Sequence, residues 1–319
     1  MEKLLIIIGP TATGKTDLAL FLANKFQGEL VSADSRQVYK GLDIGTGKAP
    51  STGNWKIEDG RWIVNGINIW MYDVVDPSKQ YSAADYVQDA GQVIKDIVSR
   101  GKLPVIVGGT GLYIKVLLDG LSNLQVTPNL NLRRELADFS VIALQQKLQQ
   151  LDPVRWDKLN LPDRQNKRRL VRAIEITINT AKTRDWQGLK KEFDIFAVGL
   201  TAPRNVLYKK VDVRVLSRID QGMIEEADWL HSNGLSFERM RNLGLEYGVL
   251  ADYLEGVVTS KDDLIKSLQG KIHAYIRRQL TWFKKFNDVF WFDISEKDFT
   301  RKVENAVGKW YHQTNDTKD

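Results

Sequence analysis

The sequence has 319 residues, of which 43% are hydrophobic and 27% are charged, a balance typical of a globular protein. Lys and Arg number 46 against 40 for Asp and Glu, so the formal net charge is +6, a basic excess that fits a polyanionic partner. The chain has no cysteine, which excludes disulfides and thiolate zinc sites, and it has no apolar run long enough to span a bilayer.

The N-terminus runs from Met1 directly into a short apolar stretch and shows no secretory signal. Residues 3–8, KLLIII, form a continuous apolar run of the kind found in buried parallel strands, and the run ends at Gly9-Pro10. Hydrophobic residues then recur at helical spacing over residues 17–26. We therefore expect a soluble cytoplasmic protein that begins with a strand, a glycine loop and a helix.

Strands and helices then alternate along the chain. The apolar patterns predict strands over residues 28–35, 67–77 and 103–113 and a helix over residues 81–102. Residues 51–68 carry glycines and apolar residues at strand-like spacing, which predicts an exposed hairpin without an assigned role. The alternation predicts an α/β fold of the P-loop NTPase-like type, in which helices cover a parallel sheet.

The middle of the chain has a different character. Residues 119–198 are largely polar, rich in Gln and Arg and helical in pattern, so we expect an all-helical insertion domain there. The α/β catalytic core then comprises residues 1–118 and 199–311, and residues 312–319 form a polar tail. The elements predicted late in the chain are a strand over 193–203, helices near 205–233 and 261–286, and a strand over 289–294.

Residues 9–16, GPTATGKT, match the pattern G-x-x-x-x-G-K-[ST] and lie between a predicted strand and a predicted helix, as a phosphate-binding loop requires. Backbone N–H groups of such a loop and of the following helix bind phosphate oxygens. The lysine adds a positive charge, and the hydroxyl of Thr16 can ligate Mg²⁺. The predicted diphosphate- or nucleotide-binding residues are Gly9, Pro10, Thr11, Ala12, Thr13, Gly14, Lys15 and Thr16.

Three further polar residues are candidates for chemistry, each with an ordinary alternative. Asp34 directly follows a strand, which places it near the phosphate loop, but it could instead cap a helix together with Ser35. Thr110 ends the next strand, where it could simply be a solvent-facing residue of a glycine turn. Arg214 lies off the apolar stripe of its helix, where a surface ion pair, for example with Asp212, is the usual role.

Six segments carry a family resemblance when they are taken in order: GPTATGKT, SADSRQVYKGLDIGTGKAP, DPSKQYSAADY, VGGTGLY, RRLVRAIEI and RRQLTWF. Together they resemble the tRNA dimethylallyltransferases, or tRNA isopentenyltransferases, from about residue 4 to about residue 292. Nucleotide kinases share only the first segment. The resemblance implies an enzyme that transfers a dimethylallyl group from dimethylallyl diphosphate to N6 of adenosine 37 in tRNA.

The same resemblance implies roles for the candidate residues. The phosphate loop would hold the diphosphate as a leaving group, with Mg²⁺ as cofactor held through Thr16. The implied catalytic residues are Asp34 as the proton acceptor, Thr110 near the reacting amine, and Arg214 as a second clamp on the diphosphate.

Contacts with tRNA are also implied. Adenosine 37 must leave its stack and enter a channel lined by residues 34–37. The segment 163–176 is dense in arginine, and on one helix Arg164, Arg168 and Arg172 would share a face, although a solvated basic face is the alternative. The expected tRNA contacts are Asp34, Ser35, Arg36, Gln37, Thr110, Arg133, Arg164, Arg168, Arg169, Arg172, Arg277, Arg278 and Gln279.

The chain departs from the pattern of this family in several places. Where the family often has Gly-Tyr followed by Lys or Arg, this chain has Gly244-Leu245-Glu246, which reverses a charge. Ile272-His273 replaces a usual Thr-Arg, and Ile69-Trp70 replaces a His-containing stretch. The helix over 272–286 is expected to dock on the core through Ile272, Ile276, Leu280 and Phe283.

Three other functions compete with this one. An adenylate isopentenyltransferase would prenylate free AMP, ADP or ATP and would not need the basic insertion. A P-loop nucleotide kinase gives no reason for the segment DSRQVYKGLDIGTGK, and a non-catalytic tRNA-binding protein would not need the phosphate loop, Asp34 and Thr110 together. We therefore expect a monomeric tRNA adenosine-37 dimethylallyltransferase with no membrane partner.

Overall fold

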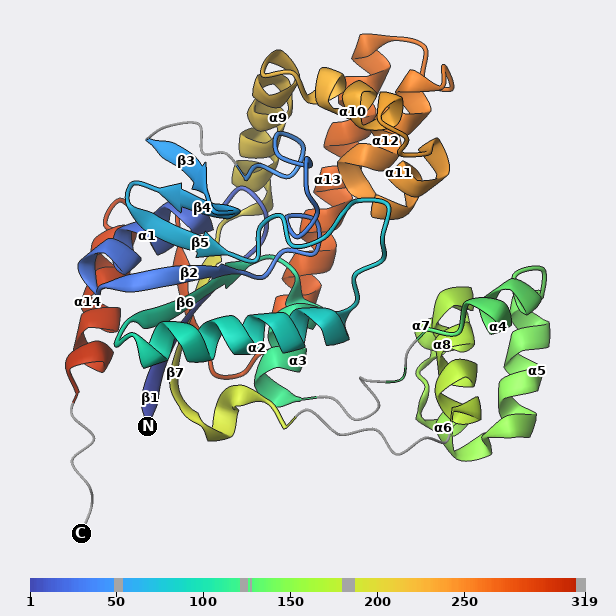
Figure 1. Cartoon of the computed structure of the whole chain (residues 1–319), viewed down its shortest axis with the longest axis horizontal. Helices are drawn as coiled ribbons and strands as arrows, with labels where there is room; N and C mark the ends of the chain where they lie inside the picture. The colour runs from blue at the N-terminus through green and yellow to red at the C-terminus, as the bar shows by residue number, and fades with distance from the viewer. Residues whose placement is uncertain (49–53, 121–125, 127, 180–186, 314–319) are drawn as a thin grey trace. The chain divides into compact units, whose positions relative to one another are not determined.

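The structure, a computed structural model of the chain, describes residues 1–48, 54–120, 126, 128–179 and 187–313. The chain divides into two compact units: residues Met1–Leu118 with Leu189–Asp319, and residues Asp119–Gly188 (Figure 1). The second boundary lies after residue 188 instead of the expected 198, because the strand Phe193–Thr201 pairs with the first strand along its length. Among the described residues, no helix is long and apolar enough to cross a membrane.

The first unit contains one eight-stranded sheet in the order β3-β4-β5-β2-β6-β1-β7-β8. Its strands are β1 (Glu2–Ile8), β2 (Gly28–Ser32), β3 (Trp55–Glu58), β4 (Arg61–Val64), β5 (Ile67–Trp70), β6 (Leu103–Gly108), β7 (Phe193–Thr201) and β8 (Phe290–Asp293). From β5 to β8 in this order every pairing is parallel, whereas β3, β4 and β5 pair in antiparallel fashion. The predicted α/β fold with a parallel sheet is confirmed, and an antiparallel extension is added at one edge.

Helices cover both faces of this sheet. The helices of the first unit are α1 (Lys15–Lys25), α2 (Ala83–Ser99), α3 (Gly111–Asp119), η1 (Leu189–Lys191), α9 (Arg204–Asp220), α10 (Met223–Ser232), α11 (Phe237–Leu243), α12 (Leu245–Leu254), α13 (Lys261–Phe283) and α14 (Phe299–His312). Leu5 and Ile7 of β1 belong to a core cluster with side chains of α1 and α14. The alternate residues Leu4, Ile6 and Ile8 are also buried, which is the pattern of a central parallel strand covered on both faces.

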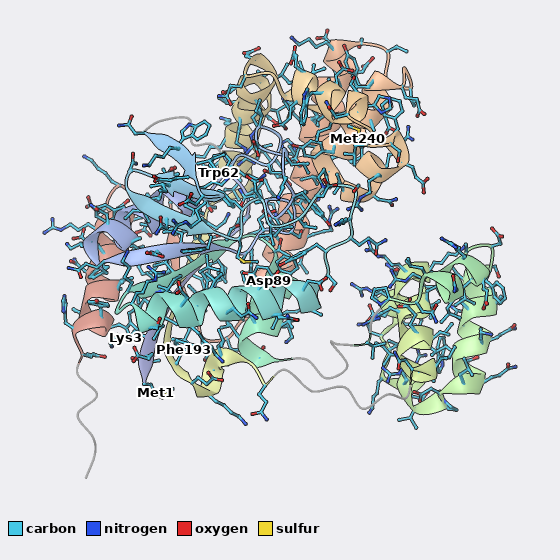
Figure 2. The ribbon with its side chains drawn as sticks, viewed as in Figure 1. Met1, Lys3, Trp62, Asp89, Phe193 and Met240 are labelled. Carbon is cyan, nitrogen blue, oxygen red and sulfur yellow. The ribbon has the colours of Figure 1, made fainter. Side chains whose placement is uncertain are left out.

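Lys3 attaches the C-terminal helix α14 to β1 (Figure 2). Its ammonium donates a hydrogen bond to the carbonyl oxygen of Trp310 at 2.7 Å and lies 3.3 Å from a carboxylate oxygen of Asp194. Helix α14 therefore belongs to the core, and it was not among the predicted elements. Of the predicted tail, residues 314–319 lie outside the described residues.

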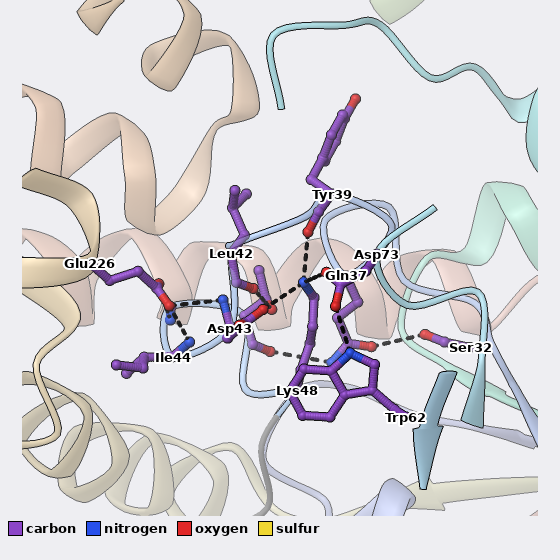
Figure 3. A network of polar contacts seen from close by, with 12 residues as sticks. Ser32, Gln37, Tyr39, Leu42, Asp43, Ile44, Lys48, Trp62, Asp73 and Glu226 are labelled. Carbon is purple, nitrogen blue, oxygen red and sulfur yellow. Dashed lines mark hydrogen bonds and ion pairs between the residues drawn. The ribbon is translucent and has the colours of Figure 1, made fainter. Parts of the chain in front are cut away.

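The segment predicted as an exposed hairpin widens the sheet. β3 is exposed, but Trp62 of β4 is only 1% exposed, so the expectation of an exposed excursion is wrong for β4. The indole N–H of Trp62 donates to a carboxylate oxygen of Asp73 (Figure 3). The Trp62 ring also stacks on Trp55, with the centroids 5.0 Å apart. Residues 51–53 lie outside the described residues.

The later helices differ in detail from the sequence pattern. The predicted helix near 205–233 is two helices, α9 and α10, separated where Gly222 adopts a left-handed φ of 98°. Helices α11 and α12 and the short α3 after the glycine turn were not predicted. Their patterns are short, and tertiary packing rather than intrinsic periodicity stabilises such helices.

The second unit is helical in all its described regular structure. Its helices are α4 (Leu130–Glu135), α5 (Val141–Leu151), α6 (Pro153–Lys158), α7 (Leu161–Arg164) and α8 (Lys167–Ile178). A small core joins them, formed by Leu132, Leu136, Leu144, Leu148, Leu170, Ala173 and Ile174. The side chain of Asn166 accepts a hydrogen bond from the backbone of Arg169, so it caps α8 and starts a new helix after α7.

Candidate active site

Three loops meet at one edge of the sheet because β2, β6 and β1 are neighbours that run in the same direction (Figure 1). The phosphate loop follows β1, Asp34 follows β2, and Thr110 follows β6. Ligands of parallel α/β folds bind at the carboxyl ends of the strands. The strand order thus brings together three candidate segments that are far apart in the sequence.

The phosphate loop curves tightly from β1 into α1. A Cβ on Gly9 would lie 2.5 Å from the carbonyl oxygen of Leu200, so only glycine fits there. Gly14 and Ala12 adopt left-handed backbone with φ of 76° and 68°, a conformation that costs a non-glycine residue energy and often marks ligand-binding turns. No side chain caps α1 at Gly14, which leaves the first N–H groups of the helix available to an anion.

Lys15 adds a half-buried positive charge to this loop. Its ammonium donates to the carbonyl oxygen of Pro10 at 2.8 Å, so it folds back over the loop. Burial, and then the charge of Arg214, lower the pKa of Lys15 from 10.5 to about 7, while Asp34 partly opposes the shift. A bound anion would stabilise the charged form of Lys15, so the site has the electrostatics of an anion-binding pocket.

Asp34 lies in a turn rather than at the start of a helix, so the helix-capping alternative is wrong. One of its carboxylate oxygens accepts the backbone N–H of Arg36 at 2.9 Å. The guanidinium of Arg36 also approaches that oxygen, with Nε 4.0 Å away. Asp34 lines the cavity described below, where its carboxylate can accept a proton or a hydrogen bond from a ligand.

Thr110 supports the turn that carries Asp34. Its hydroxyl oxygen accepts the backbone N–H of Ser35 at 3.0 Å, and its own N–H donates to the carbonyl oxygen of Ala33 at 3.1 Å. The turn before it is closely packed, since a Cβ on Gly108 would lie 2.3 Å from the same carbonyl oxygen. Thr110 is therefore held against the turn that carries Asp34, unlike a threonine that merely faces solvent.

Arg214 reaches the phosphate loop from α9. Its Nη2 donates to the hydroxyl of Thr11 at 2.8 Å, so the surface ion-pair alternative is wrong. Asp212, the expected partner in that alternative, lies 2.9 Å from Nε2 of His273. Burial and then Arg218 lower the pKa of Arg214, but a guanidinium stays protonated at neutral pH, so its charge is available to a ligand.

Gln279 connects α13 to two of the loops. Its Oε1 accepts the backbone N–H of Thr11 at 2.9 Å, and its Nε2 donates to the carbonyl oxygen of Gly109 at 2.9 Å. Gln279 is 5% exposed, whereas Leu280, predicted to be part of the buried stripe, is only half-buried. The helix thus presents to the site Gln279, one of the expected tRNA contacts, while Leu280 of the expected apolar stripe is less deeply buried.

The loop of residues 41–48 forms another wall of the site and is held by the half-buried Glu226 and the buried Lys48 (Figure 3). The carboxylate of Glu226 accepts the backbone N–H groups of Asp43, Ile44 and Gly45 at 2.8, 2.7 and 3.0 Å. The ammonium of Lys48, whose side chain is fully buried, donates to Asp43 at 2.8 Å and also reaches Asp73. Such a network of complete hydrogen bonds fixes the shape of the loop.

These segments enclose a cavity of about 410 Å³. The predicted site residues that line it are Thr11, Ala12, Gly14, Lys15, Thr16, Asp34, Arg36, Gln37, Arg214 and Gln279. Among the remaining predicted residues of this unit, the ones outside the lining are Gly9, Pro10, Thr13, Ser35, Thr110, Arg277 and Arg278. Arg277 and Arg278 are exposed on α13, where Arg277 donates to the hydroxyl of Tyr208 at 3.2 Å.

Sequence reasoning missed several polar residues of the lining, namely Tyr72, Arg218, Glu246 and Tyr275. Two of these lie one helical turn from a predicted residue: Arg218 after Arg214, and Tyr275 before Gln279. That spacing could have identified them. The ring of Tyr275 lies 4.9 Å from the guanidinium of Arg36, close enough for a cation–π contact.

The predicted basic face of the helical unit is divided between two helices. Arg164 ends α7 while Arg168 and Arg172 belong to α8, so the prediction of one continuous face is wrong. Arg164 donates to the carbonyl oxygen of Trp156 at 3.1 Å. Arg168 is exposed and forms no ion pair with another described residue.

The other arginines of this unit are paired. Arg169 pairs with Asp163. Arg133 and Arg172 both pair with the buried carboxylate of Glu175, at 2.6 and 3.2 Å. Because Glu175 would otherwise be a buried unpaired charge, Arg133 and Arg172 contribute to the fold of this unit.

Comparisons with known proteins agree with the geometry of the site. A profile of the IPP transferase family matches residues 37–286, and a profile of the isopentenyl transferase family matches residues 2–65. A tRNA dimethylallyltransferase of Halalkalibacterium halodurans is 36% identical over 312 residues, which cover 95% of this chain and 94% of that protein. A tRNA dimethylallyltransferase 1 of Geotalea daltonii is 40% identical over 285 residues, 89% of this chain and 87% of that protein.

Solved structures are similar over nearly the whole chain. The full-length tRNA isopentenylpyrophosphate transferase of Bacillus halodurans superposes with a TM-score of 0.69 at 33% identity, covering 98% of this chain and 97% of the other. A tRNA isopentenylpyrophosphate transferase of Staphylococcus epidermidis gives a TM-score of 0.67 at 29% identity, covering 97% and 99%. The phosphate loop, the carboxylate beside it and these similarities lead to one conclusion: the chain belongs to the tRNA dimethylallyltransferase family.

Proposed function

We propose that this enzyme transfers the dimethylallyl group of dimethylallyl diphosphate to N6 of adenosine 37 in tRNA. The observation that carries the proposal is the cavity in which the phosphate loop and Asp34 lie together. One part of the cavity can hold a diphosphate, and another presents a carboxylate to the acceptor amine. Its lining also includes Leu20, Ile69 and Val107, apolar side chains that suit a five-carbon chain.

In the proposed reaction the bond between C1 of the dimethylallyl group and the diphosphate oxygen breaks, and a bond forms between C1 and N6. The diphosphate leaves with the electron pair and gains negative charge as it does so. Lys15, Arg214 and the N–H groups at the start of α1 are positioned to stabilise that charge, because all of them face the loop. The same groups would stabilise a transferring phosphoryl group in a kinase. Here they stabilise a diphosphate that leaves from carbon.

Asp34 receives the proton that N6 loses when the new bond forms. The exocyclic amine of adenine is a weak nucleophile, since its lone pair is delocalised into the ring. A carboxylate at hydrogen-bonding distance both orients the amine and removes its proton. Thr110 and Ser35 position Asp34, because their hydrogen bond joins the turns after β6 and β2.

The site also fits Mg²⁺. Thr16 lies in the first turn of α1 and lines the cavity, and its hydroxyl oxygen is a suitable donor for a hard cation. Magnesium usually takes few protein ligands and completes its coordination with substrate phosphates and water, so one hydroxyl beside the loop suffices. When bound, Mg²⁺ would neutralise part of the charge on the diphosphate.

Exposed arginines outside the cavity favour tRNA, and not a free nucleotide, as the acceptor of the dimethylallyl group. The exposed Arg168 of the helical unit and the exposed Arg277 and Arg278 of the first unit are guanidinium groups that phosphates of an anticodon stem–loop can contact. Asp34 lines the cavity, so adenosine 37 would have to leave its stack to reach it. A mononucleotide would gain nothing from arginines outside the cavity.

A transfer assay tests the proposal. The protein is mixed with labelled dimethylallyl diphosphate, Mg²⁺ and unmodified tRNA, with AMP and ATP as acceptors in parallel samples. Label in the tRNA, and its loss when adenosine 37 is changed to guanosine, is the expected result. Label in AMP or ATP instead of tRNA, or bound tRNA without label, would contradict it.

A further inference from the structure

Glu246 is a buried carboxylate among the arginines of the cavity. It is 5% exposed, lines the cavity and occupies the second position of α12. Its two oxygens lie 3.7 Å from Nη1 of Arg36 and 3.8 Å from Nη1 of Arg218. Within the described residues Oε2 has no hydrogen-bond partner, which is costly for a buried carboxylate and calls for a functional explanation.

The positive charges around Glu246 fall into two groups. Arg214 and Lys15 contact the phosphate loop itself, through Thr11 and Pro10. Arg36 and Arg218 line the same cavity but face Glu246, and Arg36 also lies 4.0 Å from Asp34, so two carboxylates oppose their two positive charges. Without Glu246 the cavity would hold a second cluster of guanidinium groups, which is the usual recognition site of a phosphate.

We propose that Glu246 is a specificity determinant, an internal counter-ion that limits the cavity to a single diphosphate group. This inference rests on the proposed function, because it concerns the same cavity. By offsetting part of the charge of Arg36 and Arg218, the carboxylate makes the phosphate loop, with Lys15 and Arg214, the favoured place for phosphoryl groups. A ligand with an additional phosphoanion, such as a free nucleotide beside the diphosphate, is then repelled by Glu246.

The geometry around Glu246 supports this role. The guanidinium of Arg218 donates to the carbonyl oxygen of Gly45 at 2.8 Å, so it is anchored to the wall and does not depend on Glu246 for its position. Arg36 is anchored by its contact with the ring of Tyr275. Neither approach to Glu246 is as short as an ordinary charged hydrogen bond of about 2.8 Å. The arginines are thus held independently, and Glu246 mainly supplies charge.

The test compares two inorganic anions, diphosphate and tripolyphosphate, in binding to the parent and to Glu246→Gln. Calorimetry gives the ratio of the dissociation constants of diphosphate and tripolyphosphate for each protein. In the variant, tripolyphosphate should gain about ten-fold relative to diphosphate, because Arg36 and Arg218 become available to its third phosphoryl group. A ratio within about two-fold of the parent would overturn the proposal.

Two control variants separate this effect from simpler ones. Glu246→Asp keeps the charge and should keep the ratio of the parent. Glu225→Gln removes the same charge from an exposed position on α10, and it should leave the ratio unchanged because screened surface charges act weakly. An equal gain in Glu225→Gln would show that net charge alone is responsible and would overturn the proposal.

If Glu246→Gln is too unstable for calorimetry, its thermal unfolding with and without tripolyphosphate tests the same proposal. Arginines that have lost their counter-ion repel one another, so tripolyphosphate should raise the Tm of the variant more than that of the parent. A variant that tripolyphosphate does not stabilise more than the parent contradicts the proposal. All of these measurements use binding alone, so their outcome is independent of whether dimethylallyl transfer to tRNA is observed.

Discussion

The side-chain oxygen of Gln279 accepts the backbone N–H of Thr11 at 2.9 Å, which joins the longest described helix, α13, to the phosphate loop. The same side chain donates to Gly109 at the end of β6. A Cβ on Gly109 would lie 2.4 Å from Nε2 of Gln279, so the glycine is what permits this approach. One buried amide therefore sets the distance between two of the loops that form the cavity.

Gln279→Ala should weaken the binding of dimethylallyl diphosphate. Both the N–H of Thr11 and the carbonyl of Gly109 lose a partner, which costs about 1–3 kcal/mol for each buried group left unsatisfied. We expect KM for dimethylallyl diphosphate to rise about ten-fold and the free energy of unfolding to fall by a similar energy, about 1–3 kcal/mol. Kinetics and urea denaturation measure both. Thr281→Ala, at an exposed position of the same helix, is the control, and an unchanged KM in Gln279→Ala would refute the coupling.

Asp34→Asn should reduce turnover while tRNA binding persists. Asparagine can still accept the N–H of Arg36, so the turn is retained, but it cannot take the proton of N6. We expect kcat to fall by about 10²–10⁴ and the Kd for tRNA to stay within about three-fold. Asp76→Asn is a matched control, because Asp76 accepts the N–H of Ser78 at 2.8 Å in a similar exposed turn. Normal turnover in Asp34→Asn would remove Asp34 as the proton acceptor.

The binding of diphosphate should depend on pH through Lys15. Its pKa is lowered to about 7 in the empty cavity, mainly by burial and then by Arg214, and a bound diphosphate raises it again. Above pH 7 binding must therefore be accompanied by proton uptake, and the affinity should fall by up to about ten-fold per pH unit as the pH rises. Below pH 7 Lys15 is charged in both states and this dependence disappears.

Titration calorimetry in buffers of different ionisation enthalpy measures the proton uptake. Subtracting the proton uptake of Lys15→Met from that of the parent removes the contribution from protonation of diphosphate itself. The stability of the ligand-free protein should depend on pH in the opposite sense. In the unfolded chain Lys15 keeps its ordinary pKa of 10.5, so between pH 7 and 10.5 the unfolded state binds more protons than the folded state. The Lys15 contribution to stability should therefore increase with pH over that window. Equal proton uptake by parent and Lys15→Met at pH 8 would count against this assignment.

Two arginines of the helical unit should respond differently to mutation. Arg168 is exposed, so Arg168→Ala should weaken tRNA binding and reduce the slope of log Kd against log salt by about one, without loss of stability. Arg133 pairs with the buried Glu175, so Arg133→Ala should lower the free energy of unfolding by about 1–3 kcal/mol. Filter binding at several salt concentrations and thermal unfolding distinguish the two effects.

Lys158→Ala is the control for the loss of a charge in the same unit, since Lys158 is exposed on α6 and outside the predicted contacts. If Arg168→Ala and Lys158→Ala reduce tRNA affinity equally, Arg168 makes no specific phosphate contact. If Arg133→Ala leaves stability unchanged, the ion pair with Glu175 does not support this unit.

Local sequence patterns were sufficient to predict the elements whose structure depends on residues close together in the chain. The continuous apolar run of β1 followed by GPTATGKT identifies a buried strand, a phosphate loop and a helix, because the close approach at Gly9 requires glycine and the positive φ of Gly14 favours it. The α/β fold and the family were predicted from such segments and are confirmed. The roles assigned to Asp34, Thr110 and Arg214 stay predictions until the variants are measured.

The tertiary structure decided what depends on contacts between distant segments. No local pattern shows that Gln279 rather than Leu280 turns toward the site, because that choice depends on how α13 packs on the loops after β1 and β6. The surroundings of Glu246 are equally non-local: its arginine partners come from the turn after β2 and from α9. The charge reversal at Glu246 is visible in the sequence, but its meaning follows only from the two guanidinium groups that the fold places beside it, since electrostatic energy depends on distance in space and not along the chain.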